Sequence, residues 1–224
     1  MSPAWNILIV NGHPITADAY KNNLLSKQKK FDLNLNLFMA NNLPTALERI
    51  GEFSLEKKCH LLLLDTNVPM DHDRKKPSLI GFCNYIKKES LKTKIIITTS
   101  YNDNLRLLNI LSKINPDGLL LKTDITCFDL LSAVKNVILG NPYYSTSVIR
   151  LLRKRISQKV ILDRIDTEIL KELSNGSKMV ELLKLIPLTK SGIEKRKRRL
   201  KSAFQTKSNS DRELVLVAKE RGFI

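Results

Sequence analysis

Five short apolar runs, each followed by a stretch with helical spacing, constrain the fold of this chain most. The apolar runs are residues 5–10, 33–40, 60–64, 94–97 and 118–121, and the helical stretches are residues 16–27, 43–50, 79–88, 105–114 and 128–139. Strands that alternate with helices indicate βαβ units and a parallel sheet. Residues 33–40 alternate apolar and polar, as a strand should, whereas the other runs are almost continuously apolar, so both faces of the sheet should be covered.

Polar residues stand where these strands end. In open parallel sheets, ligands gather at the carboxyl ends of the strands. The residues expected there are Asn11, Gly12, Asp65, Thr99 and Lys122. A carboxylate can act as a nucleophile, a hydroxyl can bind a phosphoryl oxygen and an ammonium group can neutralise its charge. The pattern therefore indicates phosphate chemistry at this edge of the sheet.

The character of the chain changes at Gly140. Residues 140–160 hold five basic residues and no acidic one, and about two-thirds of the net charge of +16 lies beyond residue 139. Helical spacing without a strand pattern then continues through residues 164–173, 177–185, 189–204 and 208–220. We expect a second, all-helical domain there. The charge favours a polyanionic partner, with nucleic acid or an anionic membrane surface as the leading candidates.

Other features favour a cytoplasmic protein without a membrane span. The apolar run of residues 7–10 is too short for a signal peptide, and no stretch approaches the ~18 apolar residues that a span needs. Cys59, Cys83 and Cys127 show no metal-ligand or redox spacing. We expect all three to be buried small hydrophobic residues in a reducing compartment.

Two sets of motifs carry a family resemblance. The first set is LIVNGHP at residues 8–14, LLDTNVP at 63–69, ITTS at 97–100 and LLKTD at 120–124. It resembles the receiver domain of NarL/LuxR-type response regulators. The second set, which is DTEILKELSNG at 166–176, KSGIEKR at 190–196 and AKERGFI at 218–224, resembles their LuxR-type helix-turn-helix. The basic run and the closing RGFI look most like regulators of the Bacteroidetes.

The resemblance implies a doubly wound, flavodoxin-like α/β receiver domain over residues 1–140. A basic linker over residues 141–160 and an all-α helix-turn-helix domain over residues 161–224 would follow. It also implies that Asp65 is the phosphoacceptor, Thr99 the switch hydroxyl and Lys122 the phosphate-binding lysine. Thr98 is adjacent to Thr99, so the identity of the hydroxyl depends on the register of one strand.

The chain departs from the family pattern at three positions. Receivers usually carry two acidic residues after the first strand, which hold Mg²⁺ beside the acceptor aspartate; here Asn11 and Gly12 stand there. Leu119 replaces the usual tyrosine or phenylalanine. We therefore expect a degenerate receiver in which Asp65 alone among acidic residues binds Mg²⁺ weakly. It would be phosphorylated poorly or not at all. The alternative is that Asp65, Thr99 and Lys122 suffice for phosphorylation.

Three further side chains near this edge are possible metal ligands. Asp71 and Asp73 follow the acceptor strand and could replace a missing carboxylate, but Arg74 and the two lysines after it favour a solvated polar loop. His13 has no second histidine close in sequence, so a structural role is favoured over metal binding.

The stretch at residues 189–204 is the expected recognition helix, with Thr189 as its N-cap. On a helical wheel, Leu200, Ala203 and Phe204 share the face of Ile193 and should pack inward. In a helix-turn-helix the N-terminal residues of this helix meet base edges and later ones hold phosphates. We accordingly expect Lys190, Ser191, Glu194 and Lys195 to read bases and Arg198, Arg199 and Lys201 to bind phosphates. Glu194 can accept from cytosine N4, and lysine can donate to guanine.

Together these features predict a transcription regulator that binds double-stranded DNA as a homodimer, and not an enzyme. A sensor histidine kinase is a further expected partner if Asp65 is phosphorylated. Residues 214–218 of the last helix form an apolar run too long for one small core, so a dimer interface and simple core packing both remain open. A rival function of another class is a protein-interaction adaptor whose basic helix binds an acidic partner.

Overall fold

The computed structural model describes residues 4–53, 58–69, 78–89, 93–101, 103–157 and 160–224. The chain divides into two compact units, one of residues 1–102 and 107–148 and the other of residues 103–106 and 149–224.

A six-stranded parallel sheet forms the centre of the first unit. Its strands are β1 (Ala4–Val10), β2 (Asn34–Ala40), β3 (Leu61–Asp65), β4 (Lys94–Thr99), β5 (Gly118–Leu121) and β6 (Tyr143–Tyr144). They lie in the order β2-β1-β3-β4-β5-β6, and each neighbouring pair is parallel. This confirms the predicted doubly wound α/β fold. The two-residue β6 was not predicted, because so short a strand leaves no periodic pattern.

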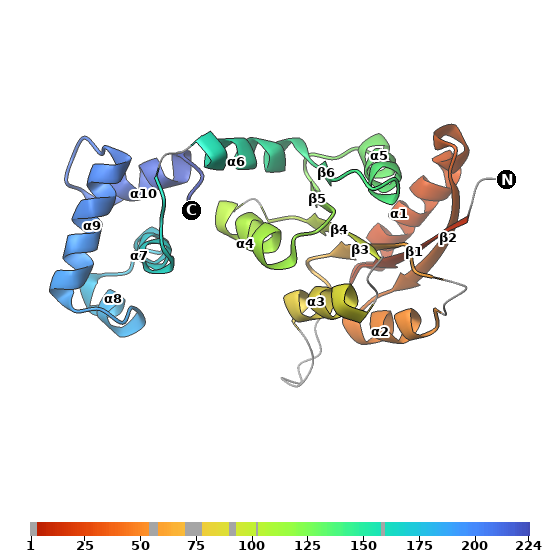
Figure 1. Ribbon diagram of the computed structural model, residues 1–224, viewed down its shortest axis with the longest axis horizontal. Helices are drawn as coiled ribbons and strands as arrows, with labels where there is room; N and C mark the ends of the chain where they lie inside the picture. The colour runs from red at the N-terminus through yellow and green to blue at the C-terminus, as the bar shows by residue number, and fades with distance from the viewer. Residues whose placement is uncertain (1–3, 54–57, 70–77, 90–92, 102, 158–159) are drawn as a thin grey trace. The chain divides into compact units, whose positions relative to one another are not determined.

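Helices cover both faces of this sheet. They are α1 (Pro14–Lys27) with the 3₁₀ turn η1 (Gln28–Phe31), α2 (Leu43–Gly51), α3 (Leu79–Glu89), α4 (Asn104–Ile114) and α5 (Cys127–Ile138). In Figure 1, α1 and α5 lie on one face and α2, α3 and α4 on the other. Side chains alternate along each strand. Ile7 and Ile9 of β1 belong to the core that includes Leu24 of α1 and Val134 of α5, and all four are fully buried.

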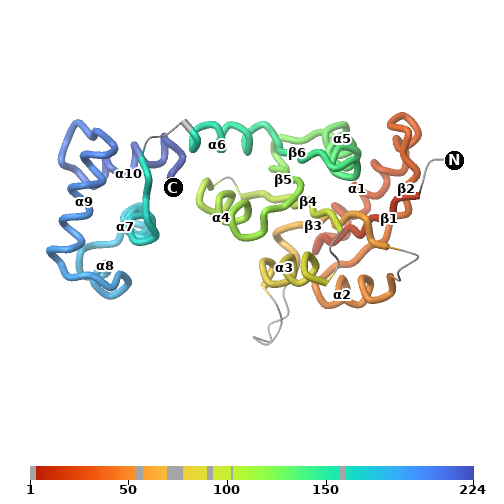
Figure 2. Tube along the Cα trace, in the orientation of Figure 1, coloured from red at the N-terminus to blue at the C-terminus, as the bar shows by residue number. Residues whose placement is uncertain are grey.

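The second unit is built from helices. They are the part of α6 (Thr146–Ser157) from residue 149 onward, α7 (Arg164–Ser174), α8 (Met179–Leu185), α9 (Lys190–Phe204) and α10 (Asp211–Glu220). A tight turn joins α8 to α9 in the Cα trace of Figure 2. Asp163 and Asp166 form a capping box at the start of α7, and the Thr189 hydroxyl caps α9 by accepting from the Gly192 amide. These caps explain why the helices begin close to the predicted positions.

The stretch expected as a linker, residues 141–160, contains β6 and α6. The second half of α6 packs within the helical unit. Leu151 is 3% exposed, and the Arg155 guanidinium lies 4.3 Å from the centroid of the Phe223 ring. The contact-based boundary between the units therefore falls inside α6, between residues 148 and 149.

The cysteines differ from expectation at one position. Cys59 and Cys83 are buried and free, but Cys127 is exposed because it occupies the first turn of α5 on the solvent side. Burial raises the pKa of the Cys59 thiol to about 11 and that of Cys83 to about 12, so both thiols stay protonated at neutral pH.

Within the described residues, no helix combines the length and apolar character needed to span a membrane.

Candidate functional site

Asp65 ends β3 and is 1% exposed. Its Oδ1 accepts from the Asn67 amide at 2.8 Å. Its Oδ2 forms an ion pair with Lys122, which directly follows β5. The sheet thus brings together an aspartate and a lysine that are 57 positions apart in the sequence, as expected for the carboxyl ends of parallel strands.

The hydroxyl that contacts Asp65 belongs to Thr98. The Thr98 hydroxyl donates to Asp65 Oδ2 at 3.1 Å, because the two residues are partners in the parallel register of β3 and β4 and their side chains share a face. Thr99 lies on the other face of the strand. Its Oγ1 is 3.0 Å from the Thr66 hydroxyl and accepts from the Tyr101 amide at 3.0 Å. The hydroxyl nearest the Asp65 carboxylate is therefore that of Thr98. Thr99, the expected switch hydroxyl, is the next residue along β4.

Asn11 completes the polar environment of Asp65. Its Nδ2 donates to Asp65 Oδ2 at 3.4 Å, and its Oδ1 accepts from the backbone amide of His13 at 2.9 Å. Tyr20 of α1 lies close by: burial, a hydrogen bond with Thr98 and the charge of Asp65 act on its phenol, and its pKa is raised. The Asp65 carboxylate therefore has one cation and several neutral donors around it.

The residues around Asp65 do not fit a typical magnesium pocket. Magnesium prefers carboxylate and water oxygens in octahedral geometry. Among the described residues, no group of three or more His, Cys, Asp or Glu side chains is placed to hold a metal ion. A Cβ atom added to Gly12 would lie 2.3 Å from Cδ of Pro69, so the proline ring fills the space that a second acidic side chain would need. Asp71 and Asp73 lie outside the described residues.

Gly12→Ala should lower the stability of the first unit by about 1–3 kcal/mol, the usual cost of forcing atoms into a packed site. The physical reason is the clash with the Pro69 ring. The matched control is Gly51→Ala in α2, where an added Cβ meets nothing within 4 Å and alanine favours the helix. Urea unfolding measures both. Equal stability of Gly12→Ala and wild type would show that the pocket has room for a side chain there.

Leu119, at the position where the family usually has an aromatic ring, is fully buried within β5. His13 is exposed and precedes α1 as its N-cap residue. In the described structure neither side chain contacts Asp65 through a hydrogen bond.

In the helical unit, α9 presents two different faces. Ile193, Leu200 and Phe204 are buried in the core, as the wheel predicted, whereas Ala203 is exposed. Lys197 is also buried, with its side chain 9% exposed. The sequence pattern missed this lysine because a basic residue in a basic run gives no sign that it faces inward.

Acidic residues of neighbouring helices engage four of the cations of α9. Arg196 and Arg199 pair with Asp163 and Asp166 at the start of α7. Lys197 and Lys201 pair with Asp211, the first residue of α10, at 2.6 and 2.7 Å. These acids belong to other helices, so sequence spacing along α9 could not reveal them.

The ion pairs at α7 shift the pKa values of their partners. Hydrogen bonds from Arg196 hold the pKa of the Asp163 carboxyl below its ordinary value, and the same bonds to Asp163 and Asp166 raise the pKa of the Arg196 guanidinium. Asp166 has a fully buried side chain, so the two arginines that face it neutralise a buried charge. We infer that Arg196 and Arg199 tie α9 to α7.

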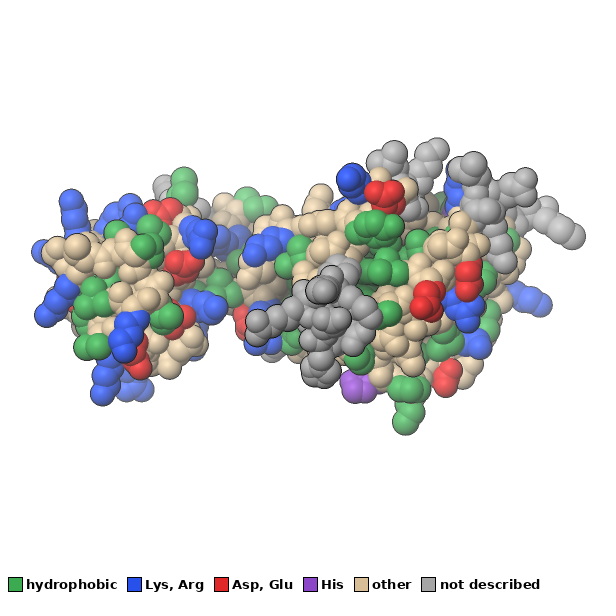
Figure 3. Space-filling model, turned by 90° about the horizontal axis from the view of Figure 1, so that it is seen from below, with side chains coloured by type: hydrophobic (Ala, Val, Ile, Leu, Met, Phe, Trp, Pro, Cys, Tyr) green, Lys and Arg blue, Asp and Glu red, His purple; other side chains and the backbone are tan. Residues whose placement is uncertain are grey.

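The remaining polar residues of α9 line its exposed face. Lys190, Ser191, Lys195 and Arg198 are exposed and Glu194 is partly exposed. No acid partner of Lys190, Lys195 or Arg198 occurs in the described part of the chain. Figure 3 shows Lys and Arg side chains around the helical unit, at the left of the view, interspersed with acidic ones. The cations available to an anionic ligand are therefore fewer than the basic run suggests, and they lie on one side of α9.

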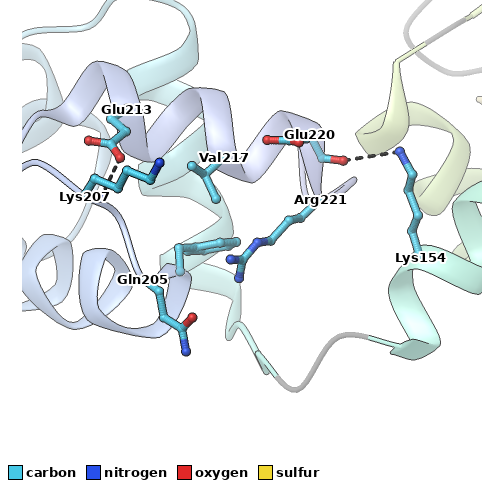
Figure 4. Close-up of a pocket in the computed structure, with 8 residues that line it drawn as sticks. Lys154, Gln205, Lys207, Glu213, Val217, Glu220 and Arg221 are labelled. Atoms are coloured by element: carbon cyan, nitrogen blue, oxygen red, sulfur yellow. Dashed lines mark hydrogen bonds between the residues drawn. The ribbon is translucent and has the colours of Figure 1, made fainter.

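A pocket of about 450 Å³ in the helical unit is lined by residues of α6, α9 and α10 and of the segments after α9 and α10 (Figure 4). The Arg221 guanidinium lies over the Phe204 ring, with 5.7 Å between the guanidinium carbon and the ring centroid. Lys154 donates to the Glu220 carbonyl at 3.3 Å. Charged groups of both signs line this pocket.

Comparison with known proteins gives structural matches only. No protein-family model matches the sequence, and no curated protein matches it. Among solved structures, the chain is similar to RcsB in an assembly of two dimers bound to two parallel DNAs. That match has a TM-score of 0.66 and 20% identity, and covers 97% of this chain and 98% of that one.

Two further structures support the same comparison. RcsB from Salmonella enterica serovar Typhimurium, bound to the promoter rprA with the phosphomimetic BeF₃⁻, matches with a TM-score of 0.64 and 22% identity over 95% of this chain and 97% of that one. The isolated REC domain of the same protein, with BeF₃⁻, matches with a TM-score of 0.54 and 21% identity. It covers 66% of this chain and 98% of that one. The chain therefore has the two-domain fold of RcsB, a protein that is a two-component response regulator.

Proposed function

We propose that this chain is a transcription regulator that binds duplex DNA as a homodimer through the exposed face of α9. The observation that carries the proposal is a set of exposed cations on one side of a capped helix, Lys190, Lys195 and Arg198, which have no acid partner among the described residues. DNA phosphates attract such cations, and a recognition helix presents its N-terminal residues to base edges. Support also comes from the fold, which is shared with RcsB structures that contain DNA.

Within this proposal, the residues of α9 divide into two groups. Lys190, Ser191, Glu194 and Lys195 face the bases, and Arg198 holds a phosphate. Arg199 and Lys201 were expected from the sequence to hold phosphates as well. Because Asp166 and Asp211 engage them, we assign both to holding the helical unit together.

We further propose that the receiver-like unit works with weak phosphorylation or none. The Lys122 ammonium already neutralises Asp65, and Pro69 occupies the place of a second acidic side chain. Little is then left to bind Mg²⁺, whose charge normally offsets that of an incoming phosphoryl group. The unit would serve as a constitutive dimerisation or small-ligand module.

A second candidate is a regulator fully switched by a sensor histidine kinase. It is favoured by the contact of an aspartate, a lysine and a threonine hydroxyl at one edge of the sheet. In that case, phosphorylation of Asp65 would replace the present ion pair between its carboxylate and Lys122. The Lys122 ammonium would then pair with a phosphoryl oxygen.

Duplex affinity with and without Mg²⁺ plus beryllofluoride separates the two candidates. A duplex is first selected from a random pool by the full chain, and its dissociation constant is then measured by fluorescence anisotropy for wild type and Asp65→Asn. Our proposal predicts values within about two-fold of one another under all four conditions, a free-energy change below about 0.5 kcal/mol. A clear gain in affinity with beryllofluoride that is lost in Asp65→Asn would establish the phosphorylation switch instead.

A further inference from the structure

Glu194 is the one acidic residue in α9, and the structure fixes its carboxylate at the exposed face. Lys197 Nζ donates to Glu194 Oε1 at 3.1 Å, one turn further along the helix. The Glu194 side chain is 42% exposed, while that of Lys197 is 9% exposed. In the described part of the chain, no group donates to Oε2 of Glu194. One oxygen is thus held from inside the protein, and the other can accept from a ligand.

Lys197 is itself held in place. Its ammonium pairs with Asp211 Oδ2 at 2.6 Å, and Asp211 Oδ1 pairs with Lys201 at 2.7 Å. Burial alone would lower the pKa of Lys197, but its hydrogen bonds to Asp211 and Glu194 outweigh burial, and the pKa is raised. The lysine therefore remains charged and its donors are directed at two carboxylates.

A fixed carboxylate in the major groove is selective because it can only accept hydrogen bonds. Guanine presents the acceptors N7 and O6, and thymine presents O4, so both repel it. Adenine offers the N6 donor, but the neighbouring N7 is an acceptor. Cytosine offers the N4 donor without an adjacent acceptor. The negative charge of the carboxylate is also repelled by the DNA phosphates. Only a base that donates a hydrogen bond to the carboxylate can offset this cost.

We propose that Glu194, positioned by Lys197, specifies a cytosine in each half of the DNA site. The inference rests on the proposed function, that α9 binds duplex DNA. Glu194 is the residue that touches the base, and Lys197 is a positioning residue that acts through it.

The test compares base preferences of wild type and Glu194→Gln. Duplexes are first selected from a random pool with the full chain. Each base pair of the selected site is then changed in turn, and the affinity of the protein for each changed duplex is measured. We expect one cytosine per half-site whose replacement weakens wild-type binding roughly 10- to 100-fold. Glutamine both donates and accepts, which matches adenine N6 and N7, so Glu194→Gln should prefer adenine at that position. Glu220→Gln in α10, an exposed glutamate, is the control with the same change of charge and should keep the cytosine.

Lys197→Met tests the positioning role in the same assay. We expect the preference for cytosine to weaken about ten-fold at that one position, while preferences elsewhere in the site stay as in wild type. A uniform loss at all positions would assign Lys197 to folding alone, and the Glu194→Gln comparison would still decide the role of Glu194.

The outcomes distinguish this inference from the function on which it rests. If wild type selects no duplex, the proposed function fails. If wild type selects a duplex and Glu194→Gln has the same preference at every position, DNA binding stands and the assignment of Glu194 to a cytosine is overturned.

Discussion

Replacing Lys195 and Arg198 together with alanine should weaken duplex binding by about 100-fold or more at ~100 mM salt. Both side chains are exposed on α9, and no acid partner for either lies in the described residues. Each phosphate contact releases counterions, and a dimer would lose the two phosphate contacts of Arg198 together with the two base contacts of Lys195. The slope of log affinity against log salt should accordingly become shallower by about 2. Anisotropy titrations at several salt concentrations measure both quantities.

The matched control removes two cations from the same unit but away from this face. Lys171 of α7 and Lys219 of α10 are exposed, and their joint replacement by alanine changes the net charge equally. We expect this variant to stay within a few-fold of wild type. If both double variants lose affinity to the same extent, overall charge and not the face of α9 determines binding.

Phe223→Ala should destabilise the helical unit by about 3–5 kcal/mol, the usual cost of deleting a buried aromatic side chain. Phe223 is 2% exposed and packs edge-on against Phe204 of α9, with 4.9 Å between ring centroids. Arg155 of α6 covers its ring. The substitution removes contacts to two helices at once, so duplex affinity should fall with stability.

Differential scanning calorimetry can follow the two units as separate transitions, which avoids treating the chain as two-state. Ile161→Ala is the control, because the Ile161 side chain is 92% exposed and its loss should change stability by less than about 0.5 kcal/mol. If Phe223→Ala unfolds at the wild-type temperature, the last residues of the chain do not belong to the core of this unit.

Periodic features of the sequence predicted most of the architecture. Apolar residues located β1 to β5 within a residue or two, because the strands of a covered parallel sheet are mostly apolar. Helical spacing located α7 to α9 in the same way, and it located α10 with a start three residues too early. The short β6 and the helix α6 were missed, since two residues carry no period and the basic run of α6 resembles a linker.

The site was predicted less completely than the fold, because its details depend on contacts between distant segments. The order of the predicted strands was enough to predict that Asp65 and Lys122 lie at one edge of the sheet. It could not decide between Thr98 and Thr99, since a shift of one residue moves a side chain to the other face of a strand. Likewise, Asp166 and Asp211 engage cations of α9 across helix interfaces, which the spacing within α9 does not reveal.

The central claim is that α9 recognises duplex DNA in a sequence-specific way. It is tested most directly by the affinity of the full chain for a selected duplex and for a shuffled duplex of equal composition, between 50 and 200 mM salt. We predict that the selected duplex binds at least about 1,000-fold more tightly and that both affinities fall steeply with salt. Equal affinity for the two duplexes, or no binding to either, would contradict the account and favour an acidic protein as the partner of the basic helix.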